Sequence, residues 1–205
     1  MKRFLTVFFS IIAFMNASSQ EIIYDAVKKD GIRRVVSNTI DLSSAFPARA
    51  MGYSLQLVTE VNVQNQNHMY YLMIRHEANG LHGANIARFV PKGKLLFRLE
   101  TNEVIELESF SIKEKHTVDT VTITQFGNFQ RIMDIYDDKS CFLISGEQIE
   151  KLCQGVKKIR IETTRGGVDS IRNIAKKLRK YNEAIQERLT YGAQLETKKD
   201  IHEGF

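Results

Sequence analysis

His76, Glu77 and His82 form a local group of residues whose types suit a metal site. Imidazole and carboxylate are common zinc ligands, and the pattern His-Glu-x-x-His places two histidines on one helix face. The spacing here differs from that pattern, and the segment spans the end of a predicted strand and a glycine-containing loop. We therefore interpret the three residues as a solvated loop, and we predict no metal and no other cofactor.

Cys141 and Cys153 are the two cysteines of the chain. A catalytic cysteine needs a histidine partner, which can come from a distant part of the sequence. Cys153 lies on the apolar face of a predicted helix, which suits a buried side chain better than a reactive thiolate. An exported chain can also oxidise two cysteines to a disulfide. A disulfide and two free thiols therefore both remain open.

An acidic cluster, Asp134, Asp137 and Asp138, is followed by Glu147 and Glu150. Paired carboxylates serve glycoside hydrolysis, in which one acts as an acid and the other as a base or nucleophile. Acidic residues are also ordinary turn formers, and we interpret residues 137–139 as a polar tip between two strands. The chain has no Gly-x-Ser-x-Gly motif. We therefore predict no catalytic residue.

Two basic patterns could contact an anion. Arg165-Gly166-Gly167 precedes a predicted helix, whose free N-terminal amides would favour negative charge, but no phosphate-binding fingerprint surrounds it. The last predicted helix has basic residues away from its apolar stripe, which could meet lipid head groups, a cell-wall polymer or an acidic partner. These residues are Arg172, Lys176, Arg179 and Lys180. The alternatives are a plain loop and a solvated helix face.

The N-terminal residues predict export. Lys2-Arg3 precedes an apolar run from Phe4 to Met15, and small residues at 17–19 allow cleavage before Gln20, which together indicate a signal peptide over 1–19. The apolar run is shorter than the roughly 20 residues of a membrane-spanning helix, and no later stretch is more apolar. We therefore expect a periplasmic or extracellular protein with no transmembrane segment in the mature chain.

The composition is that of an ordinary globular protein. The chain has 205 residues, of which 43% are hydrophobic and 26% are charged. This length predicts one β-rich domain with a C-terminal helix over 20–192, followed by a polar tail over 193–205. The formal net charge is +5 and falls by two when the leader is removed, which does not indicate nucleic-acid binding.

β-strand patterns dominate the middle of the chain. Leu95, Phe97 and Leu99 share one strand face, and Ile105 and Leu107 share one after a turn at 101–102, which predicts a hairpin over 92–109. Alternation over 53–63 and 68–77 predicts a second hairpin, whose later strand is apolar on both faces and therefore central and covered on both sides. Further strands are predicted at 32–42, 117–126, 129–136, 141–144 and 156–163.

Two helices are predicted near the C-terminus. Ser145 and Gln148 fit a capping box, and Gly155 is expected to end this short helix, at about 146–154, as its C′ residue. An apolar stripe predicts a long helix at about 168–190, with Asp169 in its first turn and Gly192 as its stop. The stripe consists of Val168, Ile171, Ile174, Ala175, Leu178, Tyr181, Ile185 and Leu189. The predicted class is α+β: a mostly antiparallel twisted sheet, or a partial barrel or sandwich, with both helices late in the chain.

The segments KLLFRLETNEVIEL and ISGEQIEKLCQGVKKIRIET, within residues 92–163, resemble those of uncharacterised small exported proteins from the Bacteroides group. The shared motifs are structural. The resemblance implies a β-rich envelope protein and transfers no catalytic or binding residue.

The sequence favours an exported, non-enzymatic binding or structural module of the periplasm or cell surface, whose partner is a protein or a cell-envelope component. The alternative is a hydrolase of unrecognised type that acts on envelope or host glycans or peptides. A flat sheet face or an open strand edge would favour a binding module. A deep pocket with convergent acids, or a histidine beside cysteine or serine, would favour a hydrolase. A further possibility is that the last helix docks on a partner or on a second copy.

Overall fold

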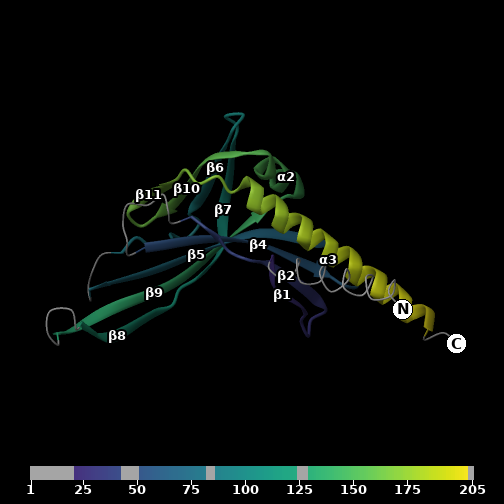
Figure 1. Cartoon of the computed structure of the whole chain (residues 1–205), viewed down its shortest axis with the longest axis horizontal. Helices are drawn as coiled ribbons and strands as arrows, with labels where there is room; N and C mark the ends of the chain where they lie inside the picture. Colours follow the sequence, from purple (N-terminus) through teal and green to yellow (C-terminus); the bar gives the residue numbers. More distant parts are fainter. Residues whose placement is uncertain (1–20, 43–50, 82–85, 124–128, 203–205) are drawn as a thin grey trace, which may run out of the picture.

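The structure is a computed structural model that describes residues 21–42, 51–81, 86–123 and 129–202. The predicted leader over residues 1–19 lies outside the described residues. One antiparallel sheet and two helices make up the described fold (Figure 1), so the predicted α+β class with a mostly antiparallel sheet is confirmed.

Among the described residues the sheet has eleven strands. In chain order they are β1 (Ile22–Val27), β2 (Ile32–Ser37), β3 (Ile40–Asp41), β4 (Met51–Asn62), β5 (His68–Leu81), β6 (Lys94–Leu99), β7 (Val104–Lys113), β8 (His116–Ile123), β9 (Phe129–Ile144), β10 (Val156–Thr163) and β11 (Gly166–Ser170). The helices are α2 (Gly146–Gln154) and α3 (Ala175–His202).

The strand order is β1-β2-β4-β5-β9-β7-β6-β10-β11, with β3 beside β4 and β8 beside β9. The sheet is therefore open, with β1 at one end and β11 at the other. β7 changes partner along its length, because its first half pairs with β6 and its second half pairs with β9. An irregularity between Ser109 and Ser111 separates the two halves. Figure 1 shows the hairpin of β8 and β9 reaching away from the helices.

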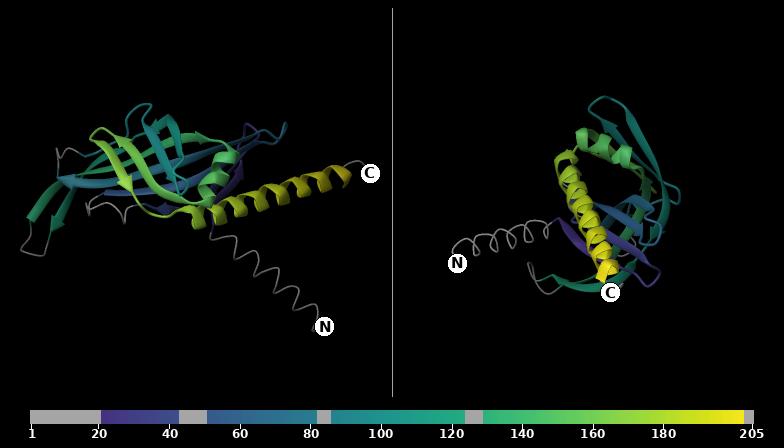
Figure 2. Two further views of the ribbon diagram at one scale, coloured as in Figure 1. Left: turned by 90° about the horizontal axis from the view of Figure 1, so that it is seen from above. Right: turned by 90° about the vertical axis from the view of Figure 1, so that its right-hand side faces the viewer.

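The main core lies on one face of the sheet, called here the inner face. α3 runs diagonally across the molecule and its C-terminal part extends beyond the sheet (Figures 1 and 2). Its apolar stripe is buried in this core through Ile174, Leu178, Tyr181 and Ile185. These residues are therefore covered by the chain itself, mainly by α2, β2 and β4, whereas Ile171 of the predicted stripe lies before the helix and is 76% exposed. Lys180 adds an ion pair with the buried Glu21 just before β1.

Both predicted hairpins are confirmed. β6 and β7 pair as expected, and Leu95, Phe97 and Ile105 are buried on the same side. Asn102 takes a positive φ of 68°, which asparagine tolerates in a tight turn. β4 and β5 form the second hairpin, and β5 is central because β9 lies on its other side. The prediction that both faces of β5 are covered is wrong, because Met69 on the opposite face is exposed.

β9 is one continuous strand of 16 residues, so the predicted polar tip at 137–139 is wrong. The acids there alternate between the two faces of the strand. Asp138 points inward and pairs with Arg88, whereas Asp137 points outward and pairs with Arg75. Arginines from distant segments thus neutralise the charges that made this stretch resemble a turn.

The short helix α2 begins as predicted. Ser145 Oγ accepts a hydrogen bond from the Gln148 amide, and the Gln148 side chain accepts one from the Ser145 amide, so the capping box is complete. Gly155 follows the helix with an extended φ of 163°, not in the left-handed conformation of a C′ glycine. A Cβ on Gly155 would lie 2.6 Å from Glu100 Cγ, so close packing is the reason for glycine at this position.

The predicted start of the long helix at about residue 168 is wrong, because α3 begins at Ala175. Gly166 turns the chain with a φ of 96°, and residues 166–170 pair back onto β10 as β11. Asp169 therefore accepts hydrogen bonds from Arg160 across this strand pair and has no place in a helix. At its other end α3 includes Gly192 and continues to His202.

Candidate functional site

A row of apolar side chains crosses the outer face of the sheet, which is the face opposite the main core. We name it the outer row; its residues are Tyr24, Val36, Val58, Tyr71, Leu143 and Phe110. The first five are direct partners in successive strands from β1 to β9. Phe110 lies at the irregularity in β7, and its ring meets the Tyr71 ring edge-on at 5.8 Å.

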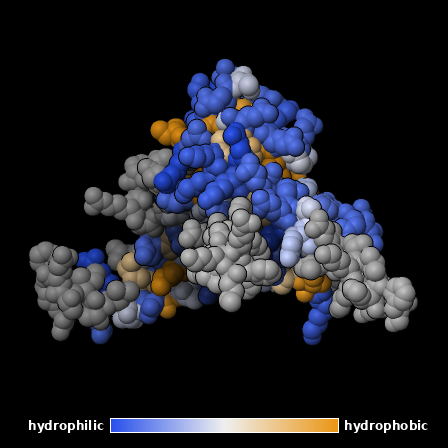
Figure 3. Space-filling model, turned by 45° about the vertical axis from the view of Figure 1, so that its right-hand side comes forward, coloured by the Kyte–Doolittle hydropathy of each residue, from blue (hydrophilic) through white to orange (hydrophobic). Residues whose placement is uncertain are grey.

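The centre of the outer row is buried and its ends are exposed. Val36, Val58 and Tyr71 form a small apolar cluster of their own. The exposed fractions of Tyr24, Leu143 and Phe110 are 44%, 49% and 51%. On the face drawn in Figure 3, apolar patches interrupt a mainly hydrophilic surface. Exposed apolar side chains that continue a buried cluster are typical of an interaction surface.

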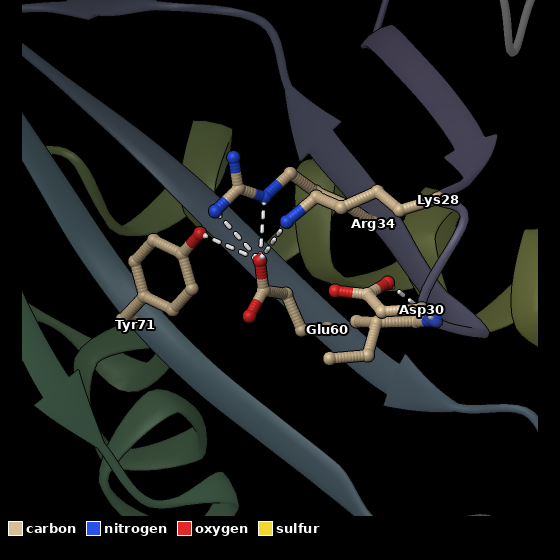
Figure 4. Close-up of polar contacts among 6 residues, drawn as sticks. Lys28, Asp30, Arg34, Glu60 and Tyr71 are labelled. Carbon is tan, nitrogen blue, oxygen red and sulfur yellow. Dashed lines mark hydrogen bonds and ion pairs between the residues drawn. The ribbon is translucent and has the colours of Figure 1, made fainter.

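Glu60 anchors the polar border of the outer row (Figure 4). One of its carboxylate oxygens accepts hydrogen bonds from Lys28 Nζ at 3.1 Å, Arg34 Nε at 2.6 Å and Tyr71 Oη at 3.4 Å. Burial alone would raise the pKa of Glu60, but the hydrogen bonds from Lys28 and Arg34 outweigh it and the pKa is lowered. The Arg34 guanidinium also lies 5.8 Å from the centre of the Tyr71 ring. These contacts hold Tyr71 in place within the row.

A second group of polar residues lies on the inner face, where β5, β9 and the start of β8 meet. Asp138 is fully buried, and Arg88 binds it through two hydrogen bonds of 2.9 and 3.1 Å. The Lys115 amide donates to the same carboxylate at 3.2 Å. Arg88 also pairs with Glu114 and lies 5.0 Å from the centre of the Tyr136 ring. The cation of Arg88 is therefore already neutralised by two acids and is not available to bind an anion.

His76 is the unusual member of this group. It is fully buried and stacks on Tyr53 with ring centres 4.4 Å apart. Neither ring nitrogen has a hydrogen-bond partner within the described part of the chain. Burial lowers the pKa of His76 to about 4; the charge of Asp138 raises it and that of Arg88 lowers it further. His76 is therefore neutral at physiological pH. Burial, with a smaller contribution from Asp138, raises the pKa of Tyr53 to about 12.

His116 and Asp134 form the arrangement that most resembles catalytic machinery. The Nε2 atom of His116 lies 2.9 Å from Oδ1 of the buried Asp134, and the imidazole remains partly exposed. Its ring stacks on Tyr136 with centres 4.5 Å apart. A carboxylate that orients an accessible histidine is typical of a general base. Among the described residues no contact joins His116 to a serine or cysteine.

The residues considered as metal ligands do not converge. His76 points into the core, whereas Glu77 is its neighbour on β5, points to the other face and is exposed. His82 lies outside the described residues. Within the described ranges no group of three or more histidine, cysteine, aspartate or glutamate side chains is placed to hold a metal ion.

The two cysteines are free thiols on opposite faces of the sheet. Cys153 belongs to the main core, where burial raises its pKa to about 11. Cys141 packs against the outer-face cluster beside Met73, and burial raises its pKa as well. Neither thiol has the lowered pKa that a nucleophile requires.

The remaining basic candidates are occupied by structural contacts. Thr164 and Arg165 form the turn between β10 and β11, and Gly166 and Gly167 begin β11, so the predicted anion cradle before a helix is wrong. Arg172 pairs with Asp41, and Arg179 donates to the Cys153 carbonyl at 2.6 Å. With the ion pair of Lys180 and Glu21, three of the four predicted basic residues thus fix α3 or the segment before it to its neighbours.

A shallow hollow lies on the exposed flank of α3. It is lined by Asn182, Glu183, Gln186, Glu187, Thr190 and Tyr191. Its two acids come from one helix, and its lining contains no histidine, serine or cysteine, so it does not meet the expectation for a hydrolase pocket.

In the parts of the chain that the structure describes, neither helix combines the length and the apolarity that a membrane crossing requires. Comparison of the chain with protein-family models, with curated proteins and with solved structures finds no match.

Proposed function

We propose that this protein is an exported, non-enzymatic binding module of the periplasm or cell surface, and that it holds a protein or envelope component against the outer row. The observation that carries the proposal is the continuity of this row across six strands, from exposed Tyr24 to exposed Phe110. Export is supported by the leader-like sequence over residues 1–19.

The energetics of the outer row support binding of moderate strength. Its centre is already buried, so a partner would need to cover only the exposed halves of Tyr24, Leu143 and Phe110. Full burial of a large apolar side chain contributes about 1.5–3 kcal/mol, and burial of the exposed half contributes roughly half of that. Because backbone and side chains are held in the sheet, little further ordering is required on this side of the interface.

Site-specific photocrosslinking tests the proposal. A benzoylphenylalanine is placed at position 110 in the outer row and, as a matched control, at the exposed Glu106 on the same strand. In cells that export the protein, we expect one discrete adduct from position 110 that is absent at position 106. The adduct should weaken when Leu143→Ser is added. Equal labelling at both positions would contradict a role for the outer row.

Export is tested separately by fractionation and N-terminal sequencing. We expect a mature chain that begins at Gln20 in the periplasmic or extracellular fraction. A chain that retains Met1 in the cytoplasm would contradict the localisation but would leave the surface argument intact.

The pairing of His116 with Asp134 favours a second candidate, a hydrolase in which His116 activates water. This reading requires turnover of a glycan or peptide substrate that is lost in His116→Gln. Absence of turnover in the unmodified protein, across envelope glycans and unstructured peptides, would eliminate it.

A further inference from the structure

In the described part of the chain, β8 is an edge strand of the sheet. Within the described ranges it pairs only with β9, over eight successive residues and without a bulge. Figure 1 shows that it lies on the outside of the projecting hairpin. An edge strand of this kind presents unpaired backbone groups that can add a strand from another chain.

The register shows which backbone groups face away from β9. The Asp137 amide donates to the Lys115 carbonyl at 2.9 Å, which makes 115 and 137 a hydrogen-bonded pair. In an antiparallel ladder such pairs alternate with pairs that are not hydrogen-bonded. Residues 117, 119, 121 and 123 therefore bond toward β9, and the backbone groups of 116, 118, 120 and 122 point outward.

One of these outward groups is already occupied. The Thr120 amide donates to the side chain of Asp119 at 2.8 Å. The Asp119 carboxylate therefore lies at the free edge. It accepts the hydrogen bond of the Thr120 amide, which an added strand would need as a donor near the middle of β8. A charge placed on an edge is a common way to prevent unwanted strand pairing.

The edge of β8 also carries apolar side chains that a second strand would cover. Val118 and Ile132 lie on the same face of the hairpin, with exposed fractions of 55% and 53%. The end strand β1 is protected differently, by an irregularity next to Tyr24 and by the adjacent Lys28 and Lys29. Within β8 itself, the side chain of Asp119 protects the edge.

We propose that β8 is an edge through which two copies of this chain pair antiparallel, and that Asp119 weakens this pairing by occupying the Thr120 amide. If the two copies of β8 are related by a two-fold axis at Val118, the outward-facing backbone donors and acceptors of one strand lie opposite those of the other. This arrangement sets Val118 against its symmetry mate and Asp119 opposite Thr117, so the like charges of the two Asp119 side chains do not face each other. The proposal does not depend on the outer row.

Sedimentation velocity of the purified exported protein, over a range of concentrations, tests the proposal. Asp119→Ala frees the Thr120 amide, and we expect self-association to tighten at least tenfold, since a hydrogen bond to a charged group is being replaced by an inter-chain ladder. Asp119→Asn keeps a hydrogen-bond acceptor and should tighten association less. An Asp119→Ala chain that associates no more strongly than the unmodified protein would overturn the proposal.

Second substitutions locate the association on β8. Thr120→Pro removes an outward amide but no bond to β9, so the double variant Asp119→Ala/Thr120→Pro should return to the unmodified level while its circular dichroism remains native. Asp119→Ala/Val118→Lys should do the same without touching the backbone. If Asp119→Ala/Val118→Lys still associates as tightly as Asp119→Ala, the contact lies elsewhere and the proposal fails. Adding Phe110→Ser to Asp119→Ala should change nothing.

Discussion

Replacement of His76 by phenylalanine is the most informative single change in the core. His76 is fully buried, stacks on Tyr53 and has no hydrogen-bond partner on either ring nitrogen in the described part of the chain. Phenylalanine preserves the stacking and removes two polar atoms that cost free energy when buried without partners. We expect His76→Phe to be no less stable than the unmodified protein at pH 7.5.

The pH dependence follows from the lowered pKa of His76. In the unfolded chain the imidazole binds a proton as the pH falls below about 6.5, but in the folded chain it does so only near pH 4. The unfolded state therefore binds more protons between these values, and stability is lost as the pH falls through this window. The difference corresponds to about 3 kcal/mol, present in full above pH 6.5 and absent below pH 4.

Urea denaturation at several pH values between 7.5 and 4.5, followed by circular dichroism, measures this loss. The difference in unfolding free energy between His76→Phe and the unmodified protein should grow as the pH falls, because only the latter has the buried imidazole. His68→Phe, which removes an exposed histidine from the start of the same strand, is the matched control. Parallel pH profiles for His76→Phe and the unmodified protein would refute the reasoning. So would a loss of more than about 2 kcal/mol at pH 7.5, since it would mean that the ring nitrogens make a favourable contact.

Three further outcomes are expected. Arg88→Ala should lower the free energy of unfolding in urea by about 3–5 kcal/mol, because it leaves the buried Asp138 carboxylate without its cation. The double variant Arg88→Ala/Asp138→Asn should recover part of that loss. Equal stability of the single and double variants would contradict this prediction. Cys141 and Cys153 should react with a thiol reagent slowly in the native protein and fully in urea, because burial raises both pKa values. The absence of any reactive thiol in urea without reductant would indicate a disulfide. Leu178→Ala should cost about 2–5 kcal/mol, since Leu178 is fully buried on the side of α3 that faces the core. A cost below about 1 kcal/mol would mean that the helix does not cover the core.

The sequence pattern within a single segment was sufficient to predict elements whose stabilising contacts all lie within that segment. The hairpin of β6 and β7 could be predicted because burial alternates with a period of two and Asn102 supplies the turn. The capping box of α2 could be predicted because Ser145 and Gln148 satisfy each other's backbone groups within four residues.

Prediction failed where distant residues decide the local structure. Asp137 and Asp138 resembled a turn because Arg75 and Arg88, which neutralise them from other segments, are far away in sequence. The start of α3 was misplaced because Val168 fits a helical stripe and a strand equally well, and pairing with β10 decides between them.

The outer row could not have been read from the sequence. Its members are spread from Tyr24 to Leu143, and each occupies one position in a different strand. Single exposed apolar residues carry no signal, because such residues are common on all protein surfaces. Only the strand order and the register of the sheet place the residues of the outer row next to one another. The same holds for His116 and Asp134, which become partners through the pairing of β8 with β9.

The change of partner along β7 has a consequence for how the molecule folds. Its first half belongs to the ladder with β6 and β10, and its second half belongs to the ladder with β9, β5 and β4. Neither ladder can be completed while β7 is detached, so loss of this strand would break both at once. Chemical denaturation should therefore give a single cooperative transition, in spite of the width of the sheet. Because most of these pairings join residues far apart in sequence, we expect refolding on the slow timescale of high-contact-order β proteins, milliseconds to seconds.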